Sequence, residues 1–326
     1  MKVRVALYGT NGHQIQHVLE DHPHAQLVAT AAFPAEALPP RLKADPGIRH
    51  HATLNELLRD GEVELVSLCS PRRRDQARDA IRCLEGGKHV YAEKPCAMTE
   101  DDLDAIVAAA RKTGRRFHEM AGTAFDQPYL AMREAVAAGT IGTVVQVFAQ
   151  KSYPYHDGRP QDEDVDGGII GQASVHALRF VEHVAGQKIA DIFAVETRLG
   201  NPVAGGGLRM ATSLMMTLEN GGVASVIANY LNPRGFGHWG NEHLRIFGTK
   251  GFIEATDAGT RTRLVVGDAD RGPIDTSAPG RDYFDFYVES LLGLGSMPFS
   301  MEDELHPTRM TIRAKRSVTR DQEKSD

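Results

Sequence analysis

Residues 3–14 read VRVALYGTNGHQ, an apolar strand pattern that runs directly into a glycine-rich turn. The strand pattern covers Val3–Tyr8, and a helical pattern follows near Gln14–Glu20. A glycine turn between a first strand and a helix offers backbone N–H groups to the pyrophosphate of a dinucleotide. This stretch therefore predicts a dinucleotide-binding α/β domain in this part of the chain.

The turn departs from the G-x-G-x-x-G pattern of such sites. Gly9 fits the first glycine position, but Asn11 and Gln14 occupy the second and third. Asparagine tolerates left-handed dihedral angles and Gly12 adds room beside it, whereas the large Gln14 side chain is expected to loosen helix–strand contact. The alternative is a tight turn that binds no ligand. We expect the coenzyme contacts of the turn to come from Gly9, Thr10, Asn11, Gly12, His13 and Gln14.

The end of the second strand leaves the coenzyme open between NAD and NADP. An NAD site usually carries Asp or Glu there for the ribose hydroxyls. Here the strand ends in Ala31-Ala32-Phe33-Pro34, without an acid or an arginine. Arg41 or Lys43 could reach a 2′-phosphate, or they could be ordinary solvated side chains.

Strands alternate with helices through the first third of the chain, which predicts a parallel sheet covered on both faces. The strand patterns cover Val3–Tyr8, Leu27–Phe33, Leu65–Cys69, Val90–Ala92 and Phe117–Met120, and the helical patterns cover Gln14–Glu20, Leu54–Arg59, Asp75–Glu85 and Asp101–Lys112. Beyond about residue 120, helical patterns at Tyr129–Ala138 and near Ile169–Ala185 accompany a series of strands. Turns such as Glu219-Asn220-Gly221-Gly222 separate those strands, which favours an antiparallel sheet.

The predicted fold class is α/β, with a Rossmann-type parallel sheet followed by an α+β domain that holds a large, mostly antiparallel open sheet. We expect residues 1–121 to form the dinucleotide-binding domain and residues 122–300 the substrate-binding and oligomerisation domain. Residues 301–326 are expected to form a helical segment that packs back on the first domain.

Composition excludes several other classes of protein. The 326 residues are 41% apolar, which argues against disorder, and their net charge of −6 is spread along the chain, which argues against a nucleic-acid surface. No apolar run approaches the roughly 18 residues that span a bilayer. The three cysteines match no zinc spacing and fit a reduced, cytoplasmic protein. Asp162–Gly167 resembles the start of a calcium loop, but Ala173 stands where the bidentate Glu belongs, so no metal is expected.

A second stretch carries a specific resemblance. Ser70-Pro71 is followed by Gly87-Lys88-His89-Val90-Tyr91-Ala92-Glu93-Lys94-Pro95, and later landmarks appear in order, including Gly248-Thr249-Lys250-Gly251. With these residues the chain resembles the glucose–fructose oxidoreductase / inositol dehydrogenase family of nicotinamide-dependent sugar and cyclitol dehydrogenases. The resemblance implies NAD or NADP as coenzyme, a sugar or polyol as substrate, and a homodimer or homotetramer formed through the second-domain sheet.

The resemblance also implies roles for individual residues. Lys94 ends a parallel strand, where it can polarise a substrate hydroxyl. His176 stands at the position of the family's catalytic histidine and is expected to be the general base or acid. Gln172, four residues earlier, replaces the family's Asp and is expected to position the substrate. The alternative for His176 is an ordinary helix histidine.

Further residues are expected to contact the coenzyme and the substrate. Coenzyme contacts are expected from Ser70, Pro71, Arg72, Glu93 and Lys94, and substrate contacts from Lys94, Gln172, His176, Tyr153, His156 and Trp239. The run Arg72-Arg73-Arg74 could bind a phosphate, or it could be a solvated helix start.

Two other functions remain open on the sequence. One is a lyase or glycosidase that retains its coenzyme and oxidises its sugar only transiently. The other is a non-enzymatic regulator that binds NAD(P) or a sugar, which the imperfect glycine turn favours.

Overall fold

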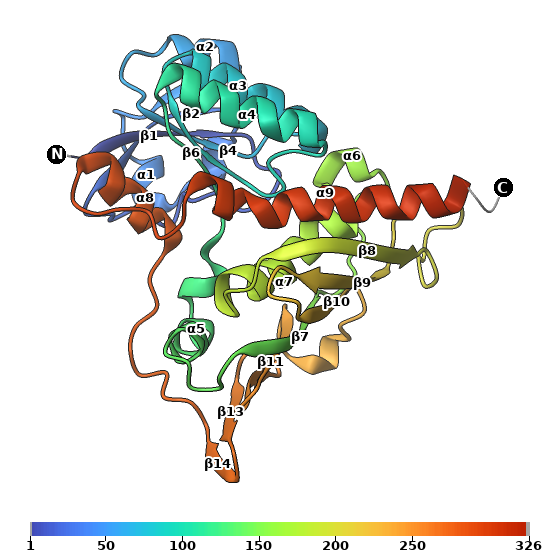
Figure 1. The fold of residues 1–326 in the computed structure, drawn as a ribbon. Helices are drawn as coiled ribbons and strands as arrows, with labels where there is room; N and C mark the ends of the chain where they lie inside the picture. Colours follow the sequence, from blue (N-terminus) through green and yellow to red (C-terminus); the bar gives the residue numbers. More distant parts are fainter. Residues whose placement is uncertain (1, 324–326) are drawn as a thin grey trace. The chain divides into compact units, whose positions relative to one another are not determined.

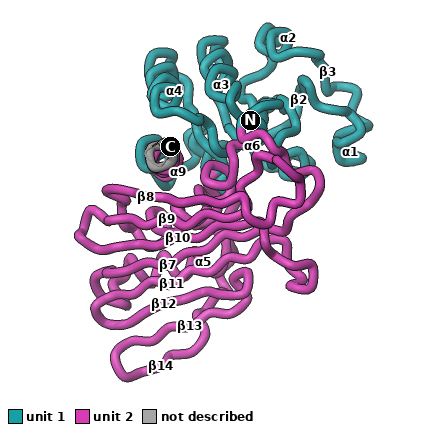
Figure 2. Tube along the Cα trace, turned by 90° about the vertical axis from the view of Figure 1, so that its right-hand side faces the viewer, with its two compact units in different colours: residues 1–120, 164–166, 283–306 teal, residues 121–163, 167–282, 307–326 magenta. Residues whose placement is uncertain are grey.

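The computed structural model describes residues 2–323 of the chain, which divide into two compact units. Unit 1 comprises residues 1–120, 164–166 and 283–306, and unit 2 comprises residues 121–163, 167–282 and 307–326 (Figure 2). None of the helices within residues 2–323 combines the length and apolar character that a bilayer crossing requires.

Unit 1 is built on a six-stranded parallel sheet with the order β3-β2-β1-β4-β5-β6. Its strands are β1 (Val3–Tyr8), β2 (Ala25–Ala31), β3 (Arg49–His51), β4 (Leu65–Leu68), β5 (His89–Ala92) and β6 (Phe117–Glu119). Its helices are η1 (Ala35–Ala37), α1 (Pro40–Lys43), α2 (Leu54–Arg59), η2 (Arg73–Asp75), α3 (Gln76–Glu85), α4 (Glu100–Thr113) and α8 (Tyr283–Leu292). The strand order reverses direction between β1 and β4, and such sheets bind ligands at the carboxyl ends of the strands beside this point.

Helices cover both faces of this sheet. Figure 1 shows α2, α3 and α4 together on one side and α8 on the other. Threonine side chains cap two of these helices: Thr53 Oγ1 accepts from the Glu56 N–H of α2 (3.3 Å), and Thr99 Oγ1 accepts from the Asp102 N–H of α4 (3.1 Å).

The predicted helix at Gln14–Glu20 is wrong. This segment forms a single helical turn, in which the Leu19 N–H donates to the Ile15 carbonyl (3.1 Å). Pro23 lies a few residues on, and the preceding His22 is held by a hydrogen bond from its Nε2 to Asp285 of α8 (2.8 Å). These constraints leave too little chain for a regular helix before β2 begins.

Helix α8 packs on the sheet through aromatic side chains. Tyr283, Phe284 and Tyr287 are buried, and the rings of Phe284 and Tyr287 lie 5.3 Å and 5.8 Å from that of Tyr91 in β5. Apolar area buried this way contributes most of the stabilisation in a domain. A helix from near the end of the chain thus completes the apolar packing of the first sheet.

Unit 2 holds an eight-stranded sheet with the order β14-β13-β12-β11-β7-β10-β9-β8, in which only the β7–β10 pair is parallel. Its strands are β7 (Val144–Ser152), β8 (Ile189–Thr197), β9 (Ala211–Leu218), β10 (Val223–Asn229), β11 (Asn241–Gly248), β12 (Gly251–Thr256), β13 (Arg261–Val266) and β14 (Ala269–Gly272). Its helices are η3 (Gly122–Phe125), α5 (Tyr129–Ala137), η4 (Ile170–Ser174), α7 (Val175–Arg179), η5 (Phe180–Val184) and η6 (Arg234–Phe236). The predicted fold class is confirmed, while β3 in unit 1 had no predicted counterpart.

Two helices have residues in both units. The short α6 spans Glu163–Asp166, and α9 spans Met301–Glu323 with Pro307 inside it. Within unit 2, the part of α9 after Pro307 covers the free edge of β8, where the Ala194 N–H donates to Ser317 Oγ (3.0 Å). An edge N–H that is satisfied in this way cannot pair with a foreign strand.

Within unit 1, the start of α9 is held to β6 by the carboxylate of Glu304. This side chain is fully buried and accepts hydrogen bonds from the Glu119 N–H (2.6 Å), His118 Nδ1 (2.7 Å) and the Tyr283 hydroxyl. Removing a buried acceptor leaves its donors unsatisfied, which is costly because they cannot turn to water.

We expect Glu304→Ala to lower the free energy of unfolding by about 3 kcal/mol, measured by chemical denaturation. Glu302→Ala on the same helix is the matched control, since it removes a solvent-exposed ion pair with Arg111 and should cost less than about 1 kcal/mol. Equal losses in the two variants would contradict the anchoring role of Glu304.

Candidate active site

The glycine turn of unit 1 packs directly on the ends of the neighbouring strands. Gly9 has φ +70°, and a Cβ there would lie 2.0 Å from the Cys69 carbonyl oxygen at the end of β4. Gly12 has φ +114°, and a Cβ there would lie 2.5 Å from Cγ of Glu93. Only glycine fits either position, because the backbone is left-handed and no room remains for a side chain.

The side chains of Arg73 and Asn11 hold the turn in place. Arg73 is almost fully buried, with Nη2 donating to the Asn11 carbonyl (2.7 Å) and Nη1 to Gln76 Oε1 (2.6 Å). Asn11 Nδ2 in turn donates to the Pro71 carbonyl (3.2 Å). Arg73 is therefore a structural residue, neither a solvated helix start nor an exposed phosphate ligand.

Gln14, at the third glycine position, ties strand ends together. Its Nε2 donates to the carbonyls of Tyr8 and Gly9 (both 2.9 Å), and its Oε1 accepts from Ser67 Oγ (2.8 Å). The expected loosening between helix and strand does not arise, because no helix follows the turn and the amide satisfies carbonyls of β1 instead.

The turn leaves its own backbone donors unused. Within residues 2–323, nothing accepts a hydrogen bond from the N–H groups of Thr10, Asn11, Gly12 or His13. Thr10, Gly12 and His13 are also exposed. A short run of unpaired N–H groups around left-handed glycines forms an anion-binding concavity, so the turn fits a dinucleotide pyrophosphate without help from a helix dipole.

Glu93 and Lys94 form a buried ion pair at the carboxyl end of β5. Each residue is 2% exposed, and Lys94 Nζ lies 3.5 Å from Glu93 Oε1. His13 Nδ1 lies 3.2 Å from the same oxygen. Burial alone would raise the pKa of Glu93, but the Lys94 ammonium and the His13 hydrogen bond outweigh it and hold that pKa at about 2. Glu93 is therefore an anion that orients Lys94 beneath the turn.

The other predicted coenzyme contacts, Ser70, Pro71 and Arg72, differ in their exposure and in their partners. Ser70 is buried, and its hydroxyl donates to Asp79 (2.9 Å). Pro71 is exposed and accepts from Asn11, as described above. Arg72 is exposed, with Nη2 3.5 Å from Asp164 Oδ2. The Lys94–Pro95 peptide bond is cis.

In unit 2, Gln172 and His176 lie on one continuous helical stretch. Its ends, η4 and η5, are π-helical around the short α-helix α7, a form that helical periodicity does not reveal and that recurs at functional sites. His176 Nδ1 lies 3.4 Å from Thr123 Oγ1, and Gln172 Oε1 accepts from the Tyr230 hydroxyl (3.2 Å). Thr123 and Tyr230 thus contact the predicted catalytic residues, although no motif in the sequence marked them.

Three of the six predicted substrate residues, Tyr153, His156 and Trp239, form one aromatic cluster. The Trp239 ring lies 5.8 Å from that of His156 and 6.4 Å from that of Tyr153. The Arg159 guanidinium, also missed in the sequence, lies 3.7 Å from the centre of the Tyr230 ring and 5.7 Å from that of Tyr153. Burial lowers the pKa of His156, and Arg159 lowers it further. Arg159 and Tyr230 therefore connect the aromatic cluster to Gln172.

The acidic stretch at residues 162–166 is engaged by cations. Arg74 Nη1 donates to Asp164 (2.6 Å), and Lys315 Nζ lies 2.8 Å from Glu163 Oε2. Over the part of the chain that the structure describes, no three side chains of the metal-binding types come together. The three cysteines are buried free thiols.

A parallel sheet with a glycine turn at its switch point, joined to a second unit with a histidine-bearing helix, defines the class of dinucleotide-binding oxidoreductases. Family models agree: residues 3–120 match the oxidoreductase family with an NAD-binding Rossmann fold, and residues 129–254 match the GFO/IDH/MocA C-terminal domain. The chain belongs to the GFO/IDH/MocA family and is an NAD(P)-dependent oxidoreductase, as the resemblance in the sequence predicted.

Individual relatives are distant. The chain is 26% identical over 241 residues to a myo-inositol 2-dehydrogenase of Thermotoga maritima, covering 73% of this chain and 70% of that protein. It is 28% identical over 267 residues to a trans-1,2-dihydrobenzene-1,2-diol dehydrogenase of Bos taurus, covering 79% and 74%. A solved oxidoreductase structure from Thermotoga maritima shares the fold, with a TM-score of 0.85, 23% identity and coverage of 97% and 98%.

The lowered pKa of Glu93 predicts a pH-dependent contribution to stability. Since its pKa falls from an ordinary 4.5 to about 2 on folding, the contribution is complete above about pH 5 and is lost as the pH falls toward 2. Its size is on the order of 3 kcal/mol. We expect Glu93→Gln to lose less stability than the parent between pH 7 and pH 3, measured by urea unfolding, and to bind coenzyme more weakly.

Asp60→Asn is the matched control. Burial would raise the pKa of Asp60, but its hydrogen bonds from Arg49, Glu62 and His51 hold it at about 2. This variant should show the same change in acid stability while keeping the parent's affinity for NAD(P). A Glu93→Gln protein that keeps both the parent's pH profile and its coenzyme affinity would refute the role assigned to Glu93.

Proposed function

We propose that this oxidoreductase transfers hydride to or from a secondary hydroxyl or keto carbon of a sugar, cyclitol or related polyol. The observation that carries the proposal is the buried Glu93–Lys94 pair at the carboxyl end of β5, beside the glycine turn. The names of the two relatives add support, because myo-inositol and dihydrobenzenediol both carry secondary hydroxyls on six-membered rings.

Lys94 acts on the oxygen of the reacting carbon. Its ammonium, oriented by Glu93, donates a charge-assisted hydrogen bond to the substrate hydroxyl and stabilises negative charge on that oxygen as the C–H bond breaks. The Glu93 carboxylate lies 3.5 Å from this ammonium and offsets part of the cost of burying its charge. Bound nicotinamide supplies the hydride acceptor or donor.

His176 takes the hydroxyl proton in oxidation and returns it in reduction. The Thr123 hydroxyl near its Nδ1 helps to orient the ring. Gln172, which accepts from Tyr230, presents its amide N–H groups to a second substrate hydroxyl. The Tyr153, His156 and Trp239 cluster offers aromatic faces and a ring nitrogen suited to the apolar face and hydroxyls of a sugar ring.

Turnover of a panel of sugars, cyclitols and sugar acids with NAD and with NADP tests this function by nicotinamide absorbance. We expect Lys94→Ala and His176→Ala each to lower kcat/KM by about 10²- to 10⁴-fold, because each removes proton transfer or charge stabilisation in the transition state. Exogenous imidazole should partly restore the activity of His176→Ala.

Exposed residues of the same types serve as controls. Lys112→Ala and His17→Ala should keep the parent's turnover, since both side chains lie on the surface of unit 1. Catalytic variants that turn over like these controls would refute the assigned roles. The protein could instead retain its coenzyme tightly and cleave or dehydrate a sugar without net turnover of added NAD(P). That result would refute the dehydrogenase reaction itself.

We also propose that the chain forms a homodimer or homotetramer through the uncovered face of the unit 2 sheet. Phe193 and Val195 of β8, Met215 of β9 and Val223 of β10 point outward with exposures of 44%, 54%, 69% and 45%. Phe193 pairs with Met215 across adjacent strands, so part of this apolar surface is continuous. Continuous apolar surface of this kind is typical of a protein–protein interface.

Light scattering coupled to size exclusion tests the assembly. The parent should elute as a dimer or tetramer, and Met215→Lys should dissociate it because a desolvated ammonium would face the partner's apolar residues. Leu199→Lys, at an 84% exposed position beyond the end of β8, should leave the assembly unchanged. A monomeric parent, or a Met215→Lys protein of the parent's mass, would contradict the proposal.

A further inference from the structure

We propose that unit 1 carries a second ligand site, separate from the coenzyme turn, which binds a small organic anion with an apolar body through Arg116. The site is a cavity of about 470 Å³ beside the edge strand β6. That volume lies within the range of small-molecule sites.

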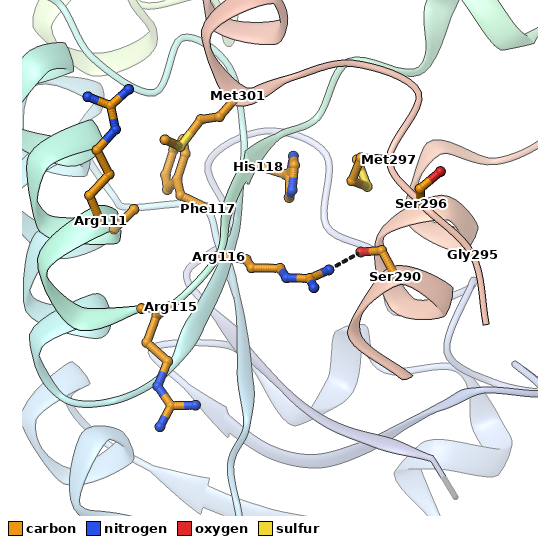
Figure 3. Close-up of a pocket in the computed structure, with 12 residues that line it drawn as sticks. Arg111, Arg115, Arg116, Phe117, His118, Ser290, Gly295, Ser296, Met297 and Met301 are labelled. Carbon is orange, nitrogen blue, oxygen red and sulfur yellow. Dashed lines mark hydrogen bonds between the residues drawn. The ribbon is translucent and has the colours of Figure 1, made fainter. Parts of the chain in front are cut away.

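Two segments that are distant in the sequence form the walls of this cavity. One wall is the end of α4 and the start of β6, and the other is the end of α8 with the connection to α9. Figure 3 shows Arg116 reaching from the first wall to Ser290 of the second, with Ser296 and Met297 beside it. Phe117 and Met301 add apolar surface, so the cavity combines the guanidinium groups of Arg111, Arg115 and Arg116 with thioether and aromatic walls.

Arg116 is fixed in place before any ligand arrives. Its Nη1 donates to Ser290 Oγ (2.8 Å), and Ser290 Oγ donates onward to the Tyr287 carbonyl (2.8 Å). The backbone of Arg116 is held as well, since its N–H donates to His89 Nδ1 (3.0 Å) and its carbonyl accepts from the Tyr287 hydroxyl (2.8 Å). A guanidinium held this way needs little ordering to bind an anion.

Within residues 2–323, two of the lining arginines have no ion-pair partner, although Glu302 and Glu304 pair with the lining residues Arg111 and His118. Among the described residues, no carboxylate forms an ion pair with Arg116 or with the neighbouring Arg115, whereas Arg111 on the same wall is paired with Glu302. The pKa of His89 responds to this charge: burial is the largest cause that lowers it to about 4, and Arg115 and Arg116 follow. An anion would therefore find uncompensated positive potential here.

The cavity is distinct from the coenzyme site. Arg115 and Arg116 precede β6, so they lie at the amino end of a strand that runs parallel to its neighbours. The glycine turn follows the carboxyl end of β1, so it lies at the opposite end of these parallel strands. A ligand at Arg116 would therefore not compete with the pyrophosphate.

The chemistry of the walls defines the ligand class. Guanidinium pairs best with the oxygens of a phosphate monoester or a carboxylate. The Phe117, Met297 and Met301 side chains favour a compact apolar group attached to that anion. We therefore infer a phosphate monoester or carboxylate of low molecular mass, and phenyl phosphate and benzoate represent the two chemistries.

Calorimetric titration of the full chain tests the site, with NAD and NADP present to occupy the glycine turn. We expect phenyl phosphate or benzoate to bind with one site per chain, and the stronger of the two identifies the anionic group. Arg116→Gln should weaken that binding at least tenfold, because a charge-assisted hydrogen bond is lost. Met297→Glu, which places a carboxylate on the wall, should abolish binding without touching Arg116.

Arg59→Gln is the control for net charge, since Arg59 is an exposed arginine at the end of α2. It should bind the probe as the parent does. Binding of neither probe, equal binding of the neutral analogue benzyl alcohol, or unchanged affinity in Arg116→Gln would each overturn the proposal.

Discussion

The buried carboxylate of Glu93 is the constraint on which the coenzyme end of unit 1 depends. A carboxylate that is 2% exposed is stable only as part of an ion pair or hydrogen-bond network, and here Lys94 and His13 both contact one of its oxygens. Its methylene group also occupies the space where Gly12 would carry a side chain. One residue thereby determines the identity of the turn above it and the position of the ammonium beside it.

The glycine turn keeps its backbone geometry although no regular helix follows β1. Arg73 and Gln14 hold the turn through its carbonyls and those of β1. The N–H groups of residues 10–13 stay available to a ligand. Fixed N–H dipoles are the larger part of an anion site at a helix N-terminus, so their presence preserves binding capacity where the helix itself is absent.

In unit 2 the replacement of an acidic residue by Gln172 changes the setting of His176. Thr123 and Tyr230 contact His176 and Gln172 respectively, and both are neutral. Gln172 lies in the π-helical turn η4, and His176 lies in the α-helical turn α7 that follows it.

Much of the fold could be predicted from the sequence, because periodic patterns report burial. The predicted ranges for β1 and α2 match the observed Val3–Tyr8 and Leu54–Arg59. The helix at residues 14–20 failed because a local pattern does not record the tertiary hydrogen bond of His22 to Asp285. The three-residue β3 is too short to show any period.

The candidate site could be predicted only in part, because local sequence patterns do not record tertiary contacts. Lys94, Gln172 and His176 belong to motifs with fixed spacing. Arg73, Arg159 and Tyr230 act through contacts that form only after folding, so a run of arginines or a tyrosine just after a strand gives no sign of them. Burial was the missing information, since Arg73 is 2% exposed and its two neighbouring arginines are exposed.

A crystal structure of the complex with NAD or NADP tests the central claim most directly. The account predicts pyrophosphate oxygens within hydrogen-bond distance of the N–H groups of residues 10–13, with Glu93 still buried against Lys94. A pyrophosphate bound elsewhere, or a Glu93 side chain turned away from Lys94 in the complex, would contradict it.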